Sequence, residues 1–257
     1  MHILLTNDDG ILAPGLAAMY RQLVTLGDVS VAAPDTAQSA SAHAITVNAP
    51  LTASQVRVQN EFRGWSIGGR PADCVKLAVS DLVESRPDLV VAGVNDGANV
   101  SINVLYSGTV AAAAEGALLG IPSVAVSLEH GDELDFDGAA RIARTLIKHM
   151  IDRCLTPGKL INVNIPSLKP GRPKGVRVVP QAVQIMDDHY VERDGPFGSR
   201  QFWLQGSFKE FGDDANTDLR SIVDGYVVIT PLHVDLTDRT RLSELAEWDW
   251  PDVTGGR

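Results

Sequence analysis

The sequence predicts an α/β protein with a doubly wound, mostly parallel sheet of the Rossmann-like kind. Over the first two-thirds of the chain, short apolar runs alternate with segments of helical hydrophobic periodicity. The clearest apolar run, residues 88–93, is typical of a strand buried on both faces. Beyond about residue 166 the pattern changes to short β-like segments with turn signals between them, which predicts a second, antiparallel region.

Each element has its own local signal. Residues 1–6 are predicted as the first strand, and the helix that follows at 14–26 begins with Pro14 and is ended by Gly27. Because strands alternate with helices, we expect right-handed crossovers that place helices on both faces of the sheet. The further predicted strands are 28–33, 44–48, 62–67, 88–93, 123–128 and 160–164, and the further predicted helices are 71–84, 108–119 and 136–153.

The C-terminal part has a different character, so we expect a core at residues 1–166 and a C-terminal part at 167–257 within one functional domain. Antiparallel β-structure is predicted at 176–183, 188–191 and 201–208, followed by a helix at 217–223 and a strand at 226–230. A two-stranded arm is marginally stable alone, so this C-terminal antiparallel β arm is expected to serve oligomerisation. Trp248 and Trp250 in the tail are expected on the surface.

The composition excludes several classes of function. The net charge of −10 argues against binding to duplex nucleic acid or to anionic membranes. Cys74 and Cys154 belong to no Cys/His cluster, so neither structural zinc nor a disulfide framework is expected. The chain has no signal-like start and no apolar stretch of bilayer-spanning length, and we therefore expect a cytoplasmic protein.

Two adjacent carboxylates, Asp8 and Asp9, follow the first apolar run in the sequence Asn-Asp-Asp-Gly. Paired carboxylates at the end of a buried strand raise each other's pKa or bind a cation, and no Lys or Arg precedes Arg21. Asp-Asp-Gly is also common in turns and helix N-caps, so the pair alone leaves both interpretations open. The functional hypothesis is a divalent metal, because open α/β sheets bind ligands at the carboxyl ends of their strands.

Two more loops follow predicted strands and carry small polar residues. In the loop at 35–43, Ser39 is the candidate hydroxyl, although such a loop is also typical of a plain surface. The loop after residue 93 carries Asn95 and Asn99, whose amides suit polar ligands. Loops that follow parallel strands share one edge of the sheet, so these side chains are expected to converge with the acidic pair.

Ser107, Gly108 and Thr109 open the alanine-rich helix predicted after the third loop. Free backbone N–H groups and the helix dipole at such a start favour an anion such as phosphate, although the same residues also form an ordinary N-cap. No Walker A sequence and no GxGxxG after the first strand occur. Together with oxygen ligands that suit Mg²⁺ or Mn²⁺, this pattern indicates metal-assisted phosphoryl hydrolysis.

Longer motifs carry a family resemblance. NDDG, the AP…QS loop, GGRPADCV, GVNDGANV…YSGTVAAAAEG and TPLHVDLT together resemble the stationary-phase survival protein SurE family, over nearly the whole chain. The resemblance implies a metal-dependent phosphomonoesterase, a 5′/3′-nucleotidase that hydrolyses nucleoside monophosphates to nucleoside and phosphate. It also implies a homodimer or homotetramer whose subunits exchange C-terminal elements.

The resemblance also implies roles for individual residues. One divalent ion per subunit, Mg²⁺ or Mn²⁺, is expected on Asp8, Asp9, Ser39 and Asn95. Ser107–Thr109 and Asn99 are expected to bind phosphate. Our own mechanistic hypothesis makes Asp8, Asp9 and Asn95 the catalytic residues. One of the two aspartates is the candidate general base, with Asp8 preferred.

The sequence departs from the family pattern at three places and leaves rivals open. Ala40 replaces a frequent Gly, the stretch around His43 lacks the usual polar run, and Arg70 stands where a threonine-like residue is expected. For Arg70, His43 and His233 a surface or structural role is the simpler interpretation. The rivals are a Mg²⁺-binding receiver-like signalling domain and a nucleotide-binding protein without catalysis. The receiver is disfavoured because the strand at 88–93 leads into Asn95 and not into an acceptor carboxylate.

Overall fold

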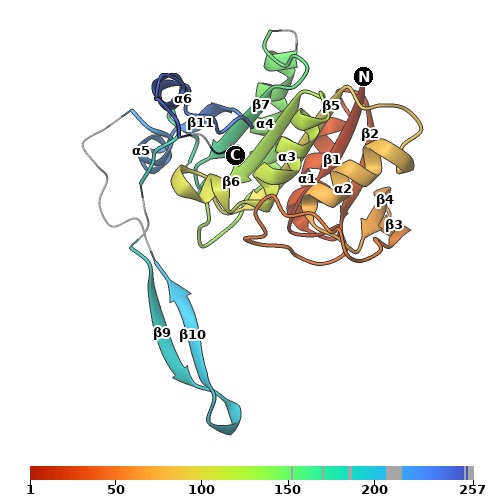
Figure 1. The fold of residues 1–257 in the computed structure, drawn as a ribbon. Helices are drawn as coiled ribbons and strands as arrows, with labels where there is room; N and C mark the ends of the chain where they lie inside the picture. The colour runs from red at the N-terminus through yellow and green to blue at the C-terminus, as the bar shows by residue number, and fades with distance from the viewer. Residues whose placement is uncertain (152, 170, 185–186, 207–215, 252, 254–257) are drawn as a thin grey trace.

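A large mixed sheet forms the centre of the molecule in the computed structural model, which describes residues 1–151, 153–169, 171–184, 187–206, 216–251 and 253 (Figure 1). Within this part of the chain the sheet has nine strands in the order β3-β4-β2-β1-β5-β6-β7-β11-β8. Their bounds are β1 His2–Thr6, β2 Asp28–Pro34, β3 Ala53–Val58, β4 Phe62–Ile67, β5 Leu89–Asp96, β6 Ser123–Leu128, β7 Leu160–Ile165, β8 Val176–Val178 and β11 Val227–Leu232.

The six central strands, from β4 to β7 in the sheet order, run parallel to their neighbours. Antiparallel pairing occurs only towards the two edges of the described sheet, where β3 joins β4 and β11 joins β7. The doubly wound, mostly parallel α/β fold predicted from the sequence is therefore confirmed.

Helices cover both faces of the sheet, as the alternating side chains of its strands require (Figure 1). Ile3 and Leu5 of β1 pack in the core beneath α1 (Pro14–Leu23) and α4 (Phe136–Ile151). Leu4, between them, faces the opposite core beneath α2 (Pro71–Leu77) and α3 (Gly108–Leu118). Because apolar residues fill both sides of β1, the acidic pair that follows it is held in a fixed place at the sheet edge.

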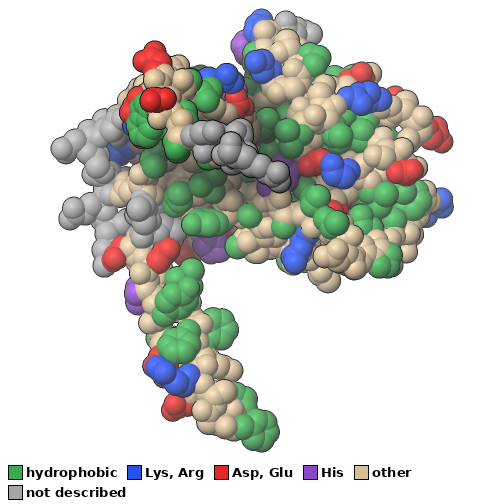
Figure 2. Space-filling model, in the orientation of Figure 1, with side chains coloured by type: hydrophobic (Ala, Val, Ile, Leu, Met, Phe, Trp, Pro, Cys, Tyr) green, Lys and Arg blue, Asp and Glu red, His purple; other side chains and the backbone are tan. Residues whose placement is uncertain are grey.

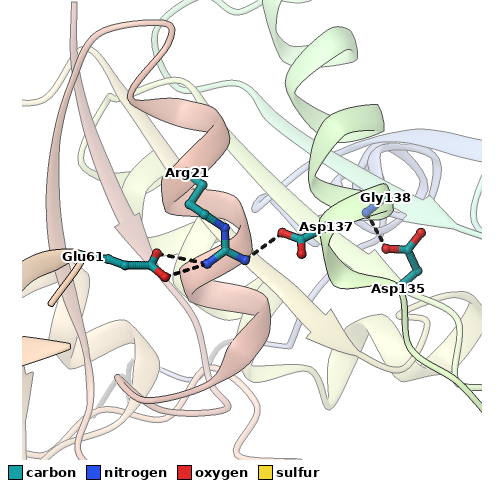
Figure 3. Close-up of polar contacts among 5 residues, drawn as sticks. All are labelled: Arg21, Glu61, Asp135, Asp137 and Gly138. Atoms are coloured by element: carbon teal, nitrogen blue, oxygen red, sulfur yellow. Dashed lines mark hydrogen bonds and ion pairs between the residues drawn. The ribbon is translucent and has the colours of Figure 1, made fainter. Parts of the chain in front are cut away.

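An ion-pair cluster ties the α1–α4 layer to the β3–β4 turn (Figure 3). The Arg21 guanidinium on α1 lies 3.0 Å from Glu61 Oε2 and 2.7 Å from Asp137 Oδ1 at the start of α4. Asp135 caps the same helix start, where its Oδ1 accepts from the Gly138 N–H at 2.7 Å. These groups are exposed, so their contribution to stability is small and their main effect is to fix the helix position.

The strands β9 (His189–Asp194) and β10 (Arg200–Gln205) form a separate antiparallel hairpin, called the arm below, which projects away from the body (Figure 1). The short 3₁₀ turn η3 (Pro196–Gly198) closes its tip. All residues of β10 are exposed, and hydrophobic side chains line the arm in the space-filling view (Figure 2). The antiparallel arm predicted from the sequence is present.

Several sequence predictions were wrong in detail. Residues 44–48 form no strand, whereas the edge strand β3 was missed because its exposed residues hide the alternation. The segment predicted at 176–183 does not join the arm: β8 lies in the main sheet, parallel to β11. The helix predicted at 71–84 changes after Leu77 into the π-helix η1 (Ala78–Leu82). Of the strand predicted at 201–208, residues 207 and 208 lie outside the described residues.

The described part of the C-terminal segment contains two short α-helices, α5 (Asp218–Val223) and α6 (Arg239–Ala246), of which only α5 was predicted. Trp248 and Trp250 are exposed, as expected, and their ring centroids lie 5.5 Å apart. The 3₁₀ turn η2 (Ser101–Leu105) precedes α3 and belongs to the site described next. None of the helices in the described ranges has the length and hydropathy needed to cross a membrane.

Candidate active site

The loops predicted to carry chemistry meet where the sheet reverses its winding. β1 lies beside β5 in the sheet, while β2 and β6 continue in opposite directions from this pair. Such a switch point leaves a crevice at the carboxyl ends of the two strands. The loops that follow β1, β2 and β5 contact one another there: the Gln38 N–H donates to the Asp8 carbonyl at 2.7 Å, and the Asp96 N–H donates to Asp9 Oδ2 at 3.3 Å.

A cavity of about 870 Å³ opens at this switch point. This volume lies within the usual range for pockets that hold small-molecule ligands. Asp9, Gly108 and Thr109 lie directly behind its wall, in contact with residues that line it. The residues predicted from the sequence that line the cavity are Asp8, Ser39, Asn95, Asn99 and Ser107.

Asp8 is almost fully buried and lies against the start of α3. The Thr109 hydroxyl donates to Asp8 Oδ1, and a side chain on Gly108 would come within 2.8 Å of Asp8 Cβ and Oδ2. Burial raises the pKa of Asp8, and its hydrogen bonds with Thr109 act in the opposite sense. Thr109, predicted to bind phosphate, thus uses its hydroxyl to orient a carboxylate.

Asp9 lies beside Asp8 and is also difficult to ionise. Burial, followed by the charge of Asp8, raises the pKa of Asp9 to about 6. Two neighbouring carboxylates with raised pKa values form a site where a bound cation is strongly favoured over two free negative charges.

The surrounding donors fit a hard divalent cation. Ser39 and Asn95 add a hydroxyl and an amide oxygen, and oxygen donors are the preferred ligands of Mg²⁺ and Mn²⁺. Asn95 Nδ2 donates to the Gly97 carbonyl at 2.7 Å, so Oδ1 is the atom that Asn95 offers to a ligand. Among the described residues, no three Asp, Glu, His or Cys side chains group so as to hold a metal.

Asn99 is held in place by three polar side chains of β6 and β7. Its backbone N–H donates to Asn164 Oδ1 at 2.7 Å, and its carbonyl accepts from Asn164 Nδ2 at 3.1 Å. Asn162 Nδ2 donates to the same carbonyl at 2.8 Å, and Asn99 Nδ2 donates to Ser127 Oγ at 2.8 Å. All four side chains are buried. The network fixes the loop between β5 and η2 and therefore one wall of the cavity.

Ser107 is the N-cap of α3, and its Oγ accepts from the Val110 N–H at 3.1 Å. The hydroxyl therefore serves the helix, and what this segment offers an anion is the group of backbone N–H donors at the start of an eleven-residue helix.

The loop that carries Ser39 is fastened on both sides of the serine. Arg70 Nη1 donates to Gln38 Oε1 at 2.7 Å, and the Ala42 N–H donates to the Tyr106 carbonyl at 3.0 Å. His43 Nε2 lies 2.9 Å from Glu115 Oε2. Arg70 and His43 thus hold the loop in place, whereas His233 is exposed in the segment after β11.

Glu115 is the buried anchor of this loop on α3. It also pairs with Lys76 Nζ at 2.6 Å, and the hydrogen bonds with His43 and then Lys76 lower the pKa of Glu115. Asp73 anchors the end of the loop, where it accepts from the Thr46 N–H at 2.9 Å.

Sequence reasoning missed several residues of the site. Ser41 Oγ is buried, lies 3.0 Å from the Cβ position of Gly108, and finds no hydrogen-bond partner in the described part of the chain. Asp96 lines the cavity and lies 2.8 Å from His130 Nδ1. The buried asparagines of β7 had a readable signal, since two amides at alternating positions of an apolar strand are unusual.

Comparison with known proteins gives consistent results. The family model described as "Survival protein SurE" matches residues 3–188. A protein named 5′-nucleotidase SurE from Syntrophobacter fumaroxidans is 43% identical over 249 residues, which cover 97% of this chain and 100% of that protein. Its namesake from Rhodopirellula baltica is 44% identical over 250 residues, or 97% and 99% of the two chains. The crystal structure of SurE protein from Aquifex aeolicus superposes with a TM-score of 0.82 at 34% identity, over 95% of this chain and 98% of that one.

Proposed function

The chain belongs to the survival protein SurE family, and from this premise we propose that it is a metal-dependent 5′-nucleotidase. The resemblance predicted from the sequence motifs is thereby confirmed. The proposed reaction is hydrolysis of a nucleoside monophosphate to nucleoside and phosphate, as the names of its relatives suggest. The observation that carries the proposal is that one cavity is lined by Asp8, Ser39, Asn95 and Ser107, which come from the loops after β1 and β2, the end of β5 and the start of α3.

In this proposal Asp8, Asp9, Ser39 and Asn95 hold one Mg²⁺ or Mn²⁺ ion per subunit. The ion supplies positive charge to the phosphate and lowers the pKa of a water molecule. The segment Ser107–Thr109 at the start of α3, together with Asn99, holds phosphate oxygens and stabilises the negative charge that develops on them. The Ser107 N–H is already bonded to the Asn103 carbonyl, so the donors that this segment offers are the N–H groups that follow it. Asn95, Asn99 and Ser107 are held by neighbours before substrate binds, so little reorganisation of these groups is required.

Asp8 is also the candidate general base. Thr109 occupies its Oδ1, which leaves Oδ2 as the oxygen that accepts a proton from the attacking water.

The proposal extends to the assembly of the protein. We propose that residues 1–166 carry the catalysis and that the 167–257 part mediates a homodimer or homotetramer. The exposed hydrophobic side chains of the arm support this, since a lone hairpin does not bury them. β8 and β11 nevertheless extend the central sheet, so the two parts share one framework. A cytoplasmic location stays a prediction.

Phosphate release tests the proposed function against its rivals. Purified protein is incubated with AMP in the presence of Mn²⁺ or Mg²⁺, with EDTA, and with the metal restored after EDTA. We expect release with metal, loss with EDTA and recovery on restoration. A receiver-like or purely nucleotide-binding protein releases no phosphate in any arm, and release that persists in EDTA contradicts the metal.

A further inference from the structure

The distal wall of the cavity is built by the base of the arm. Tyr190 of β9 and Leu204 of β10 line the cavity together with Asp188 and Gly206, which flank the two strands. A side chain on Gly206 would lie 2.1 Å from Asp188 Oδ1, so a glycine is needed for this close approach. The arm thus reaches the same space as Asp8 and Asn95, although well over ninety residues separate them in the sequence.

Tyr190 and Leu204 act as one apolar surface. They are directly opposite in the β9–β10 register, so both side chains point to the same face of the hairpin. Tyr190 is 68% exposed and Leu204 58% exposed, an exposure that is costly unless something covers them. Phe202, on the same face but nearer the tip of the arm, has the Arg200 guanidinium at 5.0 Å from its ring centroid and does not line the cavity.

The body of the protein contributes a second aromatic ring to the cavity. Tyr106 follows η2 directly, is 55% exposed, and lines the cavity immediately before Ser107. Tyr106 therefore lies beside Ser107 at the polar end of the cavity. Tyr190 and Leu204 form the wall that the arm contributes. Asp188, which lines the arm side, disfavours a second anionic group there and offers an acceptor to hydroxyl or amino groups.

We propose that the arm base, Tyr190 with Leu204, is the nucleoside-recognition surface of this enzyme, and that the base of the substrate stacks on the Tyr190 ring. The inference rests on the proposed function, which names no residues that bind the nucleoside part of the substrate, and it supplies those residues. The substrate class is a monophosphate whose distal part is flat, aromatic and uncharged, with donors for Asp188. The arm then has a role in specificity that is separate from any role in assembly.

Tyr190→Ala tests the surface with two substrates, AMP and ribose 5-phosphate, which differ only in the base. Base–aromatic stacking predicts that the KM for AMP rises by about tenfold or more in this variant. The kcat/KM for ribose 5-phosphate stays within about twofold, because the sugar phosphate does not reach the stack. Tyr190→Phe keeps the ring and is expected to retain the wild-type KM for AMP.

Trp203→Ala is the matched control, since Trp203 is an exposed aromatic residue of the same arm on the opposite face. It is expected to change neither substrate. If Tyr190→Ala leaves the ratio of AMP to ribose 5-phosphate hydrolysis at the wild-type value, or if Trp203→Ala lowers that ratio equally, the inference is overturned. A wild-type protein that releases phosphate from neither substrate overturns the proposed function instead. Size-exclusion chromatography of each variant at the assay concentration separates a loss of stacking from a loss of assembly.

Discussion

The switch-point edge of the sheet and the arm are held in place by different means. At the edge, Asp8 is buried beside Thr109, and Asn99 is fixed by the side chains of Asn162 and Asn164. In the arm, every residue of β10 is exposed and, within the part of the chain that the structure describes, the two strands pair only with each other. The side chains of a single chain are therefore enough to fix the phosphate end of the cavity. The arm leaves its side chains exposed, and we propose that its base contacts the substrate and that the rest contacts another subunit.

The largest expected effect is at the edge. Asp8→Asn keeps the size of the side chain and its contact with Thr109 but removes the charge, so phosphate release with Mn²⁺ should fall by roughly a thousandfold or more. Circular dichroism should show an unchanged fold. Asp28→Asn serves as the control. It is the same substitution at the exposed first residue of β2, and this variant should retain activity. Near-normal turnover in Asp8→Asn contradicts the site.

A smaller effect is expected one step away from the cavity. Asn164→Ala removes the two hydrogen bonds that the Asn164 side chain makes with the Asn99 backbone. Because the loop that carries Asn99 is then displaced, kcat/KM for AMP should fall by about ten- to a hundredfold. Asn162→Ala removes one bond to the same residue and should cost less. Steady-state kinetics of the two variants checks that kcat/KM falls more in Asn164→Ala than in Asn162→Ala. If both variants keep the wild-type kcat/KM, the network does not position Asn99.

The acidic pair also predicts how stability depends on pH when metal is removed. The pKa of Asp9 is about 6 in the folded chain against an ordinary value of 3.8, so the folded state holds a proton that the unfolded state has released. The free energy of unfolding should therefore fall as the pH rises from about 4 through about 6, by roughly 1–2 kcal/mol once solvent screening is included.

Urea denaturation in EDTA at pH 4.5 and pH 7 measures this difference. In Asp9→Asn the contribution of this residue disappears, and the variant should be more stable than the wild type at pH 7 without metal. A wild-type protein that loses no stability over this range would show that Asp9 ionises normally.

The smallest effect on the folded protomer is expected at the tip of the arm. Phe197 is fully exposed, so Phe197→Asp should change the free energy of unfolding by less than about 0.5 kcal/mol. If the arm packs on another subunit, the same variant should nevertheless lower the molar mass measured by light scattering. Leu118→Asp, an exposed site on α3, is the control that should keep the mass. An unchanged mass in Phe197→Asp removes the tip from the interface.

Local patterns were sufficient for the parts of the fold that are buried on both sides. β1 and β5 are continuous apolar runs, and their glycine and polar boundaries marked the site loops directly. β3 was missed because it lies at the exposed edge of the sheet. Residues 44–48 were assigned wrongly because Thr46 is held by Asp73 and not by a strand partner. The pairing of β8 depends on β11, a contact that no local pattern specifies.

The residues of the site also divide into those that local sequence predicts and those that only the tertiary fold brings in. Asp8, Ser39, Asn95, Asn99 and Ser107 were predicted because each follows a predicted strand or opens a helix, and the structure brings all five to one cavity. Tyr190 and Leu204 were not predicted, because exposed residues of a distant hairpin reach the cavity only through the tertiary fold. Thr109 was predicted to bind phosphate through the helix start, and the contact of its hydroxyl with Asp8 was not predicted, because sequence position does not reveal which side chain a hydroxyl meets.

Metal binding to the acidic pair tests the central claim most directly. Isothermal titration of the EDTA-treated and dialysed protein with Mn²⁺ should show one ion per chain, and Asp8→Asn should weaken that binding by about a hundredfold or more while Asp28→Asn leaves it unchanged. If Asp8→Asn binds Mn²⁺ as tightly as the wild type, the carboxylates at the end of β1 are not the metal site.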